Sequence, residues 1–425
     1  MEIRFKAFIK KLKITVPTNI TTELLGEHPA LESAATDLEL TSSWIRGGDG
    51  LIGFGEWKST SVKGKNRFTD ARKWWHEQLA TLKIQNSVHG SGTGPILFSS
   101  FAFDPAEESK LVIPEIIIGK RGDKSWVTWI GDANSPVISQ HKVSKSVGEV
   151  SFETGALSDS EWKNRVAQAV SKIKSGDLEK VVLARDLIAR NTESISKRNL
   201  ITYLSANYPS TWVFMVANLI GATPELLVRL NKSLVTSRIL AGTIRKSGDE
   251  AKDLGLAASL AKSSKDLEEH EYAVRSVADA LAPYCSSTNV PESPFVLHLA
   301  NVMHLATDVT GVVNDATTPI DIFALISSLH PSAAVCGTPT EIASAVINEL
   351  EEMNRGRYAG PVGWIDARGD GEIGIALRTG ELSDDGKSMR IFSGCGIVAG
   401  SNPDDELAES QAKLSPMRTA LEIRE

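Results

Sequence analysis

The chain has 425 residues, of which 41% are hydrophobic and 23% charged, values ordinary for a soluble globular protein. Its formal net charge is −7 and it has no long Lys/Arg block, which argues against nucleic acid or an anionic membrane as a partner. Cys285, Cys336 and Cys395 are widely spaced, and there is no signal-peptide or membrane-spanning apolar run. We therefore expect a soluble, cytoplasmic protein in which an anionic substrate would need local cations.

Residues 1–150 alternate short apolar runs with turn residues, a pattern that predicts a strand-rich N-terminal half. One helix is expected at about 68–82, with Trp74 and Trp75 as core residues. Near residue 150 the composition turns polar and small, so we place there the boundary to a second half, 151–425. The groups of ionisable residues that could carry chemistry all fall in this second half.

The second half mixes helices and strands. Ser158 and Glu161 form a capping-box pattern, and Gly176 lies where a C-terminal helix cap belongs. Lys180 begins a Val- and Leu-rich run typical of a strand. The other expected elements are strands at 211–218, 225–240, 372–382 and 388–393, turns at 221–224 and 394–400, and helices at 250–284, 296–309, 340–355 and from about Pro403.

Lys180 and Glu225 are the candidates for proton transfer. An ammonium inside an apolar strand is costly to bury and tends toward a lowered pKa, which a general base needs, whereas an edge-strand lysine is the structural alternative. Glu225 follows a Gly-x-x-Pro turn and opens an apolar strand, so its carboxyl would face whatever lies beyond the strand end. A solvated strand-end glutamate shows the same pattern, and position alone leaves both alternatives open.

Asp266 and Glu269 lie three residues apart on one face of the expected helix and could share a hard cation. The alternative is a solvated acidic face on which Lys265 pairs with Glu269. His304 has the pattern of a histidine on a helix face. No cysteine has a base at a readable spacing, so we assign no nucleophile.

The C-terminal segment begins with the glycine-rich stretch 394–400, where the backbone could approach a ligand closely and donate amides. Glu406, Glu409 and Lys413 then share one helix face, with two carboxylates suited to Mg²⁺, although Glu409 and Lys413 could simply form a surface pair. Arg378 stands on the small-residue face of the preceding strand. Its guanidinium could bind a carboxylate or form a structural ion pair.

Taken in order, these segments resemble the chorismate-utilising enzyme family, which contains isochorismate, salicylate, anthranilate and aminodeoxychorismate synthases. The resemblance covers roughly residues 160–420. It is carried by Leu178–Arg185, Thr223–Glu225, Leu240–Thr243, Lys265–His270, His330–Pro331, Arg357–Gly363 and Gly394–Ser401, with Glu406, Glu409 and Lys413 following.

The resemblance implies an α+β fold: one large domain of antiparallel β-sheets with helices packed outside and the active site between two halves. It implies Mg²⁺ held by Glu269 and Glu409, with Glu406 and Asp266 near or in its shell, receiving the ring carboxylate of chorismate. The substrate would also be contacted by Gly242, Thr243, His304, Tyr358, Arg378, Gly396 and Lys413, with Tyr358 and Arg378 at its ether-linked carboxylate.

Two positions sort the family's branches. Lys180 stands where ammonia-using members carry glutamine, and Ala241 where aminodeoxychorismate synthases carry a lysine nucleophile. The resemblance thus implies water as the nucleophile, and we expect an isochorismate synthase. Lys180 would take a proton from water attacking C2 of chorismate, while Glu225 protonates the departing C4 hydroxyl. These opposite roles require environments that push the two pKa values toward each other.

Three alternatives stay open. A salicylate synthase would share every residue named and go on to eliminate pyruvate. Anthranilate synthase component I is disfavoured by Lys180 and by the lack of a recognisable amidotransferase segment. A non-catalytic anion-binding module would not need the lysine, the glutamate and the acids together. We expect a monomer or homodimer with no obligate amidotransferase subunit, serving menaquinone or siderophore biosynthesis.

Overall fold

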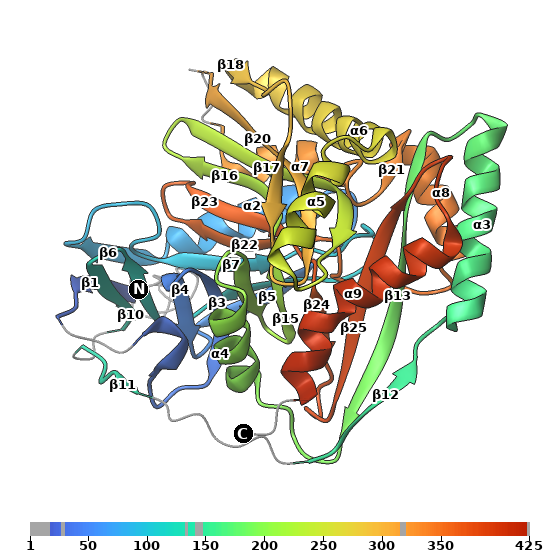
Figure 1. Ribbon diagram of the computed structural model, residues 1–425. Coiled ribbons are helices and arrows are strands. Elements are labelled where there is room, and N and C mark those ends of the chain that lie inside the picture. Colours follow the sequence, from blue (N-terminus) through green and yellow to red (C-terminus); the bar gives the residue numbers. More distant parts are fainter. Residues whose placement is uncertain (1–17, 27–29, 132–134, 141–147, 315–319, 423–425) are drawn as a thin grey trace, which may run out of the picture.

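The computed structural model describes residues 18–26, 30–131, 135–140, 148–314 and 320–422. Two large β-sheets pack against each other, and helices cover their outer faces (Figure 1). Among the described residues, neighbouring strands pair antiparallel, with one exception. β1 (Thr18–Leu24) and β6 (Leu82–Asn86) pair parallel. The expected α+β fold is confirmed.

The first sheet has 13 strands among the described residues. Ten of them run in the order β12 (Val150–Thr154), β13 (Lys180–Asn191), β25 (Ser388–Ile397), β24 (Thr379–Leu382), β15 (Leu219–Thr223), β14 (Trp212–Val216), β3 (Leu40–Arg46), β4 (Asp49–Phe54), β9 (Ile116–Arg121) and β10 (Lys124–Ile130). The order then ends with β1 and β6, and β21 (Gly337–Thr338) pairs with the start of β13.

The second sheet has ten strands in the same described ranges. Their order is β18 (Cys285–Asn289), β20 (Val302–Val313), β17 (Leu234–Arg245), β16 (Leu226–Asn231), β23 (Gly371–Ile375), β22 (Pro361–Asp366), β7 (Ile96–Ser100), β8 (Ser109–Ile113) and β5 (Lys58–Val62), with β19 (Phe295–His298) beside β20. A small separate pair is formed by β2 (Ala34–Ala35) and β11 (Ser139–Gln140).

Aromatic side chains fill the space between the sheets. Trp44 and Phe214 of the first sheet cluster with Phe98 and Trp364 of the second, and all four are almost fully buried. Because both sheets turn an apolar face inward, this cluster holds them together.

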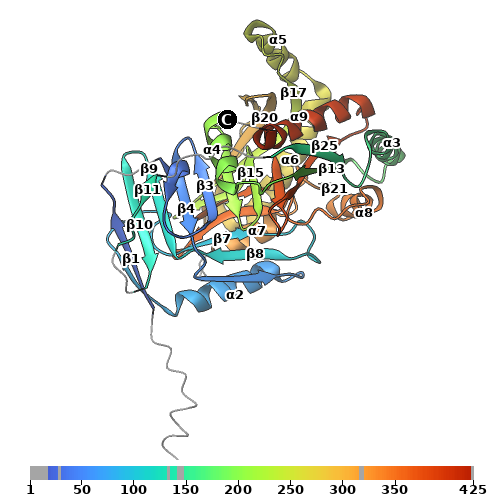
Figure 2. The ribbon, with the colours of Figure 1, turned by 90° about the horizontal axis from the view of Figure 1, so that it is seen from below.

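Helices close the two outer faces and the β13 end of the fold. Against the first sheet pack α4 (Lys197–Asn207), α9 (Pro403–Glu422) and the 3₁₀ turn η1 (Leu31–Ser33). The second sheet is covered by α2 (Arg67–Leu79), α6 (Ser264–Leu281), α7 (Ile322–Leu329) and the 3₁₀ turn η2 (Ala282–Tyr284). Near β13 lie α3 (Asp159–Ser175) and α8 (Thr340–Leu350), and α5 (Glu250–Leu260) projects from the body (Figure 2).

Local signals in the sequence placed several elements correctly. Ser158 and Glu161 form the expected capping box at the start of α3, and Gly176 ends that helix with φ +99°. β13 begins at Lys180, and α9 begins at Pro403. The amide groups of the first turn of α9 donate to Oδ1 of Asn402, which is therefore its cap.

The helix predicted at 296–309 is wrong, because this segment forms β19 and most of β20. His304 therefore lies on a strand and not on a helix face. β20 lies between β17 and the pair β18 and β19, and it is buried on both faces from Val302 to Ala306. A strand buried on both sides shows no alternation of polar and apolar residues, so its pattern resembles that of a buried helix.

The single strand predicted at 372–382 is also wrong, since the chain leaves the second sheet after β23 and enters the first sheet as β24. Arg378 lies at this crossing with φ +50°, and not on a regular strand face. The predicted turn at 394–400 starts later than expected, because β25 continues to Ile397. Gly394 and Gly396 are therefore strand residues.

Three further boundaries differ. The strand predicted at 225–240 is a hairpin of β16 and β17, and the predicted turn at 221–224 falls mostly within β15. The helix at 250–284 is interrupted between α5 and α6, where Ser263 caps the second helix. The helix at 340–355 ends at Leu350.

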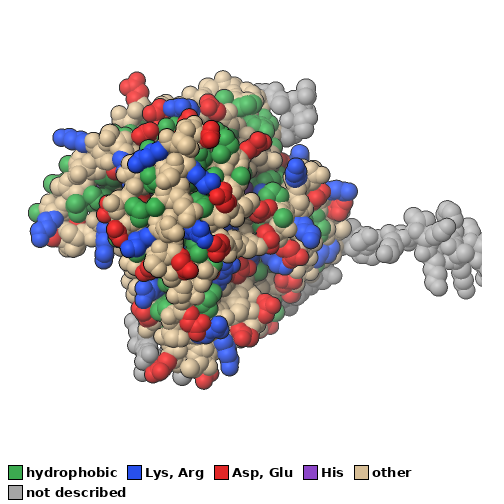
Figure 3. All heavy atoms as spheres, turned by 90° about the vertical axis from the view of Figure 1, so that its right-hand side faces the viewer, with side chains coloured by type: hydrophobic (Ala, Val, Ile, Leu, Met, Phe, Trp, Pro, Cys, Tyr) green, Lys and Arg blue, Asp and Glu red, His purple; other side chains and the backbone are tan. Residues whose placement is uncertain are grey.

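No helix among the described residues is long and apolar enough to cross a membrane. On the face drawn in Figure 3, acidic and basic side chains are interspersed, without a large area of one sign.

Candidate active site

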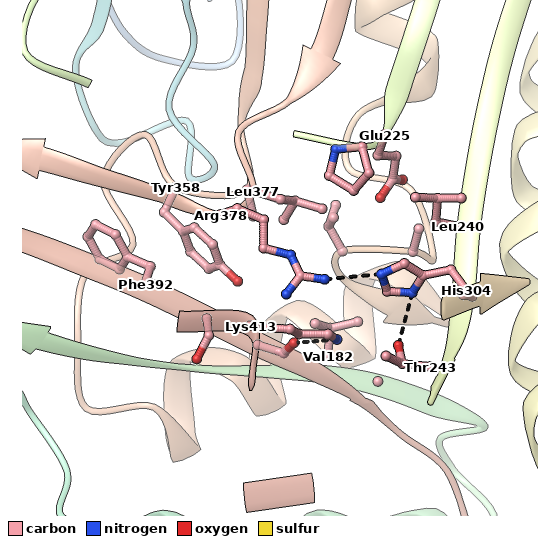
Figure 4. Close-up of a pocket in the computed structure, with 18 of the residues that line it drawn as sticks. Val182, Glu225, Leu240, Thr243, His304, Tyr358, Leu377, Arg378, Phe392 and Lys413 are labelled. Atoms are coloured by element: carbon pink, nitrogen blue, oxygen red, sulfur yellow. Dashed lines mark hydrogen bonds between the residues drawn. The ribbon is translucent and has the colours of Figure 1, made fainter. Parts of the chain in front are cut away.

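A cavity of about 660 Å³ lies where β13 and β25 of the first sheet approach β17 and β20 of the second. Nine of the predicted site residues line it: Glu225, Gly242, Thr243, Glu269, His304, Tyr358, Arg378, Gly396 and Lys413. Six of them, all except Gly242, Glu269 and Gly396, are labelled in Figure 4. Lys180, Asp266, Glu406 and Glu409 are not on its wall.

Glu225 lies between β15 and β16 and is 5% exposed. Burial raises the pKa of its carboxyl to about 8, although the positive charges of Lys180 and Lys413 act in the opposite direction. The side chain is therefore mostly protonated at neutral pH and faces the cavity (Figure 4). The solvated strand-end alternative is excluded, and the group can donate a proton.

Lys180 is fully buried at the start of β13, with β21 on one side and β25 on the other. This position excludes the edge-strand alternative. Its Nζ lies 3.4 Å from Oε1 of Glu269 and has no hydrogen-bond partner. Glu269 lines the cavity, so Lys180 lies directly behind the wall.

Arg378 points into the cavity and is held by a hydrogen-bonded chain (Figure 4). Its Nη2 lies 3.1 Å from Nε2 of His304, whose Nδ1 lies 3.1 Å from Oγ1 of Thr243. Burial and the neighbouring cation Arg378 hold the pKa of His304 well below its usual value, so the ring is neutral. Since a guanidinium only donates, Nε2 accepts, and the ring proton lies on Nδ1.

The second terminal nitrogen of the Arg378 guanidinium, Nη1, is buried and has no hydrogen-bond partner. Burial lowers the pKa of this side chain to about 10, so it still carries its charge at neutral pH. A buried cation is costly unless an anion offsets its charge, and Glu409 does so only from beyond ion-pair distance. The structural ion pair considered from the sequence is absent from the described residues, and Nη1 remains free for a ligand carboxylate.

Tyr358 and Lys413 complete the polar wall. Burial raises the pKa of the Tyr358 phenol to about 12, so its hydroxyl keeps its proton. Its ring stacks on Phe392 with centroids 5.0 Å apart. Lys413 donates to the carbonyl of Gly394 at 2.9 Å and pairs with Glu409 at 2.5 Å.

Three of the four predicted metal ligands lie beside the cavity, and the fourth, Glu269, lines the cavity itself. Glu406 and Glu409 oxygens lie within 4.8 Å of each other and of the Cys395 sulfur. Asp266, Glu406 and Glu409 line a second cavity, which shares Thr243 with the first. Lys265 pairs with Glu406 at 2.7 Å, so the pairing with Glu269 that the sequence allowed is not formed.

These acids fit a hard cation. Burial and the charge of Glu409 raise the pKa of Glu406 to about 7. Burial also disfavours the charge of Glu409, but Lys413 outweighs it and lowers the pKa of that carboxyl. Crowded buried carboxylates of this kind offer the oxygen donors that Mg²⁺ and similar ions prefer, and a cation would relieve their repulsion. The Cys395 thiol donates to the carbonyl of Glu406 and is unsuited to such an ion.

Two glycines let the backbone come close to these acids. A Cβ placed on Gly396 would lie 2.0 Å from Oε1 of Glu269. Gly242 adopts φ +77° at an irregularity of β17, and a Cβ there would lie 2.9 Å from the Cβ of Asp266. Side chains at either position would displace the acids.

Sequence reasoning missed Arg355 and the apolar part of the wall. Arg355 lines the cavity, pairs with buried Glu351 and donates to the carbonyls of Val182 and Val335. Its spacing of four residues from Glu351 is that of any exposed helix pair, so nothing in the sequence marked it. Leu240 and Leu377 also line the cavity, and their positions there depend on how distant strands pair in the sheets.

Comparison with known proteins gives consistent results. An isochorismate synthase of Bacillus subtilis, DhbC, is 33% identical over 352 residues, covering 80% of this chain and 84% of that protein. The isochorismate synthase MenF of the same organism is 31% identical over 394 residues, covering 85% and 83%.

Solved structures share the fold. A 2,3-dihydroxybenzoate-specific isochorismate synthase described as putative, from Bacillus anthracis, superposes with a TM-score of 0.74 at 30% identity, over 90% of this chain and 96% of that one. The menaquinone-specific isochorismate synthase of Escherichia coli gives 0.75 at 21% identity over 99% of both chains, a likeness of fold. The family model described as "Chorismate binding enzyme" matches residues 43–422. The chain belongs to the chorismate-binding enzyme family.

Proposed function

We propose that this protein is a Mg²⁺-dependent isochorismate synthase. The observation that carries the proposal is Glu225, a buried and mostly protonated acid facing a cavity whose opposite wall presents Arg378 and Lys413. Such a cavity suits a reaction in which an anionic substrate loses a hydroxyl group. Relatives that share about a third of their residues with this chain over most of their length are named isochorismate synthases.

The substrate would be held by its two carboxylates. Arg378 Nη1, which has no partner, and the Tyr358 hydroxyl would receive the ether-linked carboxylate. The ring carboxylate would lie toward Thr243 and Lys413, beside the acids. A net charge of −7 does not prevent binding of a dianion, because these cations are local.

Proton transfer would be divided between two residues. In its neutral form, Lys180 takes a proton from the water that forms a bond to C2, and Glu225 gives a proton to the C4 hydroxyl, which leaves as water. The ring double bonds shift between these carbons, so one water enters and one leaves, and chorismate becomes isochorismate. Glu269 contacts Lys180 and lines the cavity, so its carboxylate would orient the lysine.

Glu269 and Glu409 would hold Mg²⁺, with Glu406 and Asp266 at or near it. The ion would neutralise the ring carboxylate and fix its position. Because water is the proposed nucleophile, no amidotransferase subunit is required.

One assay tests the proposal. The protein is incubated with chorismate and Mg²⁺, with and without ammonium, and the products are separated by chromatography. Isochorismate in both arms supports it. Salicylate with pyruvate would assign the protein as a salicylate synthase, anthranilate only with ammonium would make it an anthranilate synthase component, and no turnover would leave an anion-binding module.

A further inference from the structure

A third cavity is separate from the candidate active site. It contains about 950 Å³ of space that no atom fills and shares no lining residue with the candidate active site. Strands of both sheets form it: β3, β4, β9 and β14 of the first sheet and β16, β22 and β23 of the second. Its polar wall carries three arginines, Arg46, Arg121 and Arg229.

The carboxylate at the floor of this cavity is already fully engaged. Oε1 of Glu372 accepts from Nε of Arg229 at 2.9 Å, and Oε2 accepts from the indole nitrogens of Trp44 at 2.9 Å and Trp212 at 3.1 Å. Glu372 thus neutralises Arg229 and fixes two tryptophans. The floor is rigid before any ligand arrives.

The other two arginines have no carboxylate within ion-pair distance among the described residues. Arg46 lies over the ring of Trp212, 4.1 Å from its centroid, and donates to the carbonyl of Ser210 at 3.1 Å. Burial and the positive charges of Arg238 and Arg229 lower its pKa, although the carboxylates of Glu372 and Asp308 act in the opposite direction. Arg121 is exposed at the rim, and Asp49, the other acid of this wall, accepts from the amide of Gly122.

We infer that this cavity binds a small organic carboxylate, held by the guanidinium groups of Arg46 and Arg121. Guanidinium groups recognise carboxylates through paired hydrogen bonds, and the ligand's apolar body would lie against Leu51 and Trp364 on the same wall. The inference is independent of the proposed reaction, because it uses none of the residues assigned to it.

Benzoate is a suitable probe, titrated into the full-length protein by isothermal calorimetry. The wild type binds it, and Arg46→Gln and Arg121→Gln each weaken binding at least about tenfold, equal to about 1.4 kcal/mol. Arg121 is exposed, so its replacement tests the site even where Arg46→Gln impairs folding. Arg190→Gln is the matched control, since this arginine is 58% exposed in a surface pair with Glu153.

Two further arms locate the binding and define its chemistry. One outcome is that benzoate binding is lost in Arg378→Gln and kept in Arg46→Gln and Arg121→Gln. That result would place the probe in the candidate active site and overturn the inference. Absence of benzoate binding to the wild type would also overturn it. Benzyl alcohol, which lacks the charge, does not bind. Inorganic phosphate binds more weakly than benzoate, and tighter binding of phosphate would refute the assignment to a carboxylate.

Discussion

The Nζ of Lys180 lies 3.4 Å from Oε1 of Glu269, and the side chain of the lysine is fully buried. The proposed base and a proposed metal ligand are therefore direct neighbours. At this distance, the charge of each side chain acts directly on the other. Metal binding and proton abstraction should consequently depend on each other.

Replacing Lys180 by alanine should lower turnover by about 10²–10⁴-fold, the usual contribution of a general base. The measurement is the rate of isochorismate formation, with circular dichroism as a check on folding. Lys172→Ala is the control, because Lys172 is a half-exposed lysine of α3 paired with Glu349. Near wild-type rates in Lys180→Ala would remove the lysine from the mechanism.

Glu225→Gln should abolish turnover, because the amide cannot give up a proton. In the wild type the acid must be protonated, so kcat should fall as pH rises through about 8, the raised pKa of Glu225. A pH profile of kcat measures this limb, and a rate that stays constant to pH 10 would contradict it.

The same substitution should affect stability with a defined sign. A raised pKa means that the folded state holds its proton more tightly than the unfolded state, so the Glu225 contribution is complete below about pH 4.5 and is lost as pH rises to about 8. Glutamine stays neutral throughout. The melting temperature of Glu225→Gln relative to the wild type should therefore increase with pH, and a difference that does not change with pH would contradict the buried neutral acid.

Gly396→Ala should impair Mg²⁺ binding, because the new Cβ would lie 2.0 Å from Oε1 of Glu269 and 3.1 Å from Cε of Lys180. The Mg²⁺ concentration for half-maximal activity should rise at least about tenfold, as expected for a displaced ligand. Gly400→Ala is the matched control, since a Cβ there meets no atom within 4 Å. Equal Mg²⁺ requirements in the two variants would argue against Glu269 as a ligand.

Removal of the metal should abolish turnover reversibly. Treatment with EDTA should remove activity, and added Mg²⁺ should restore it. Glu269→Gln should lose activity at any practical Mg²⁺ concentration, whereas Glu271→Gln on the same helix should not, because Glu271 is exposed and pairs with Arg275. Full activity in EDTA would exclude a metal role for these acids.

His304→Ala should lower kcat/KM for chorismate by about 10–100-fold, the range for losing a hydrogen bond to a charged group. The loss should fall mainly on KM, because His304 holds Arg378 at 3.1 Å and does not itself transfer a proton. His298→Ala, an exposed histidine of β19, is the control. A loss confined to kcat would instead point to a chemical role.

The sequence predicted best what local chemistry determines. The capping box of α3 and the helical face shared by Glu406, Glu409 and Lys413 depend on residues a few positions apart, and both are present in the structure. The motifs around Lys180 and Glu225 also led to buried positions beside one site. What burial does to these side chains, such as the raised pKa of Glu225, depends on distant strands.

Long-range arrangement accounts for the errors. The course of β20 could not be read from its composition, because its neighbours on both sides come from segments far away in the chain. Arg378 lies in the connection between β23 of the second sheet and β24 of the first, so its conformation depends on both sheets. The third cavity could not be predicted from the sequence, because its arginines, Arg46, Arg121 and Arg229, are spread over almost 200 residues.

Each of the two large sheets contains strands from both sides of the sequence boundary near residue 150. In the first sheet β14 pairs with β3, and in the second β22 pairs with β7, so each sheet is assembled from both halves of the chain. A protein cut at this boundary would expose two unpaired strand edges in the C-terminal piece, together with Phe214 and Trp364. The C-terminal half is therefore not a separable domain. Expressed alone it should aggregate, because strands of the N-terminal half pair with both of these edges.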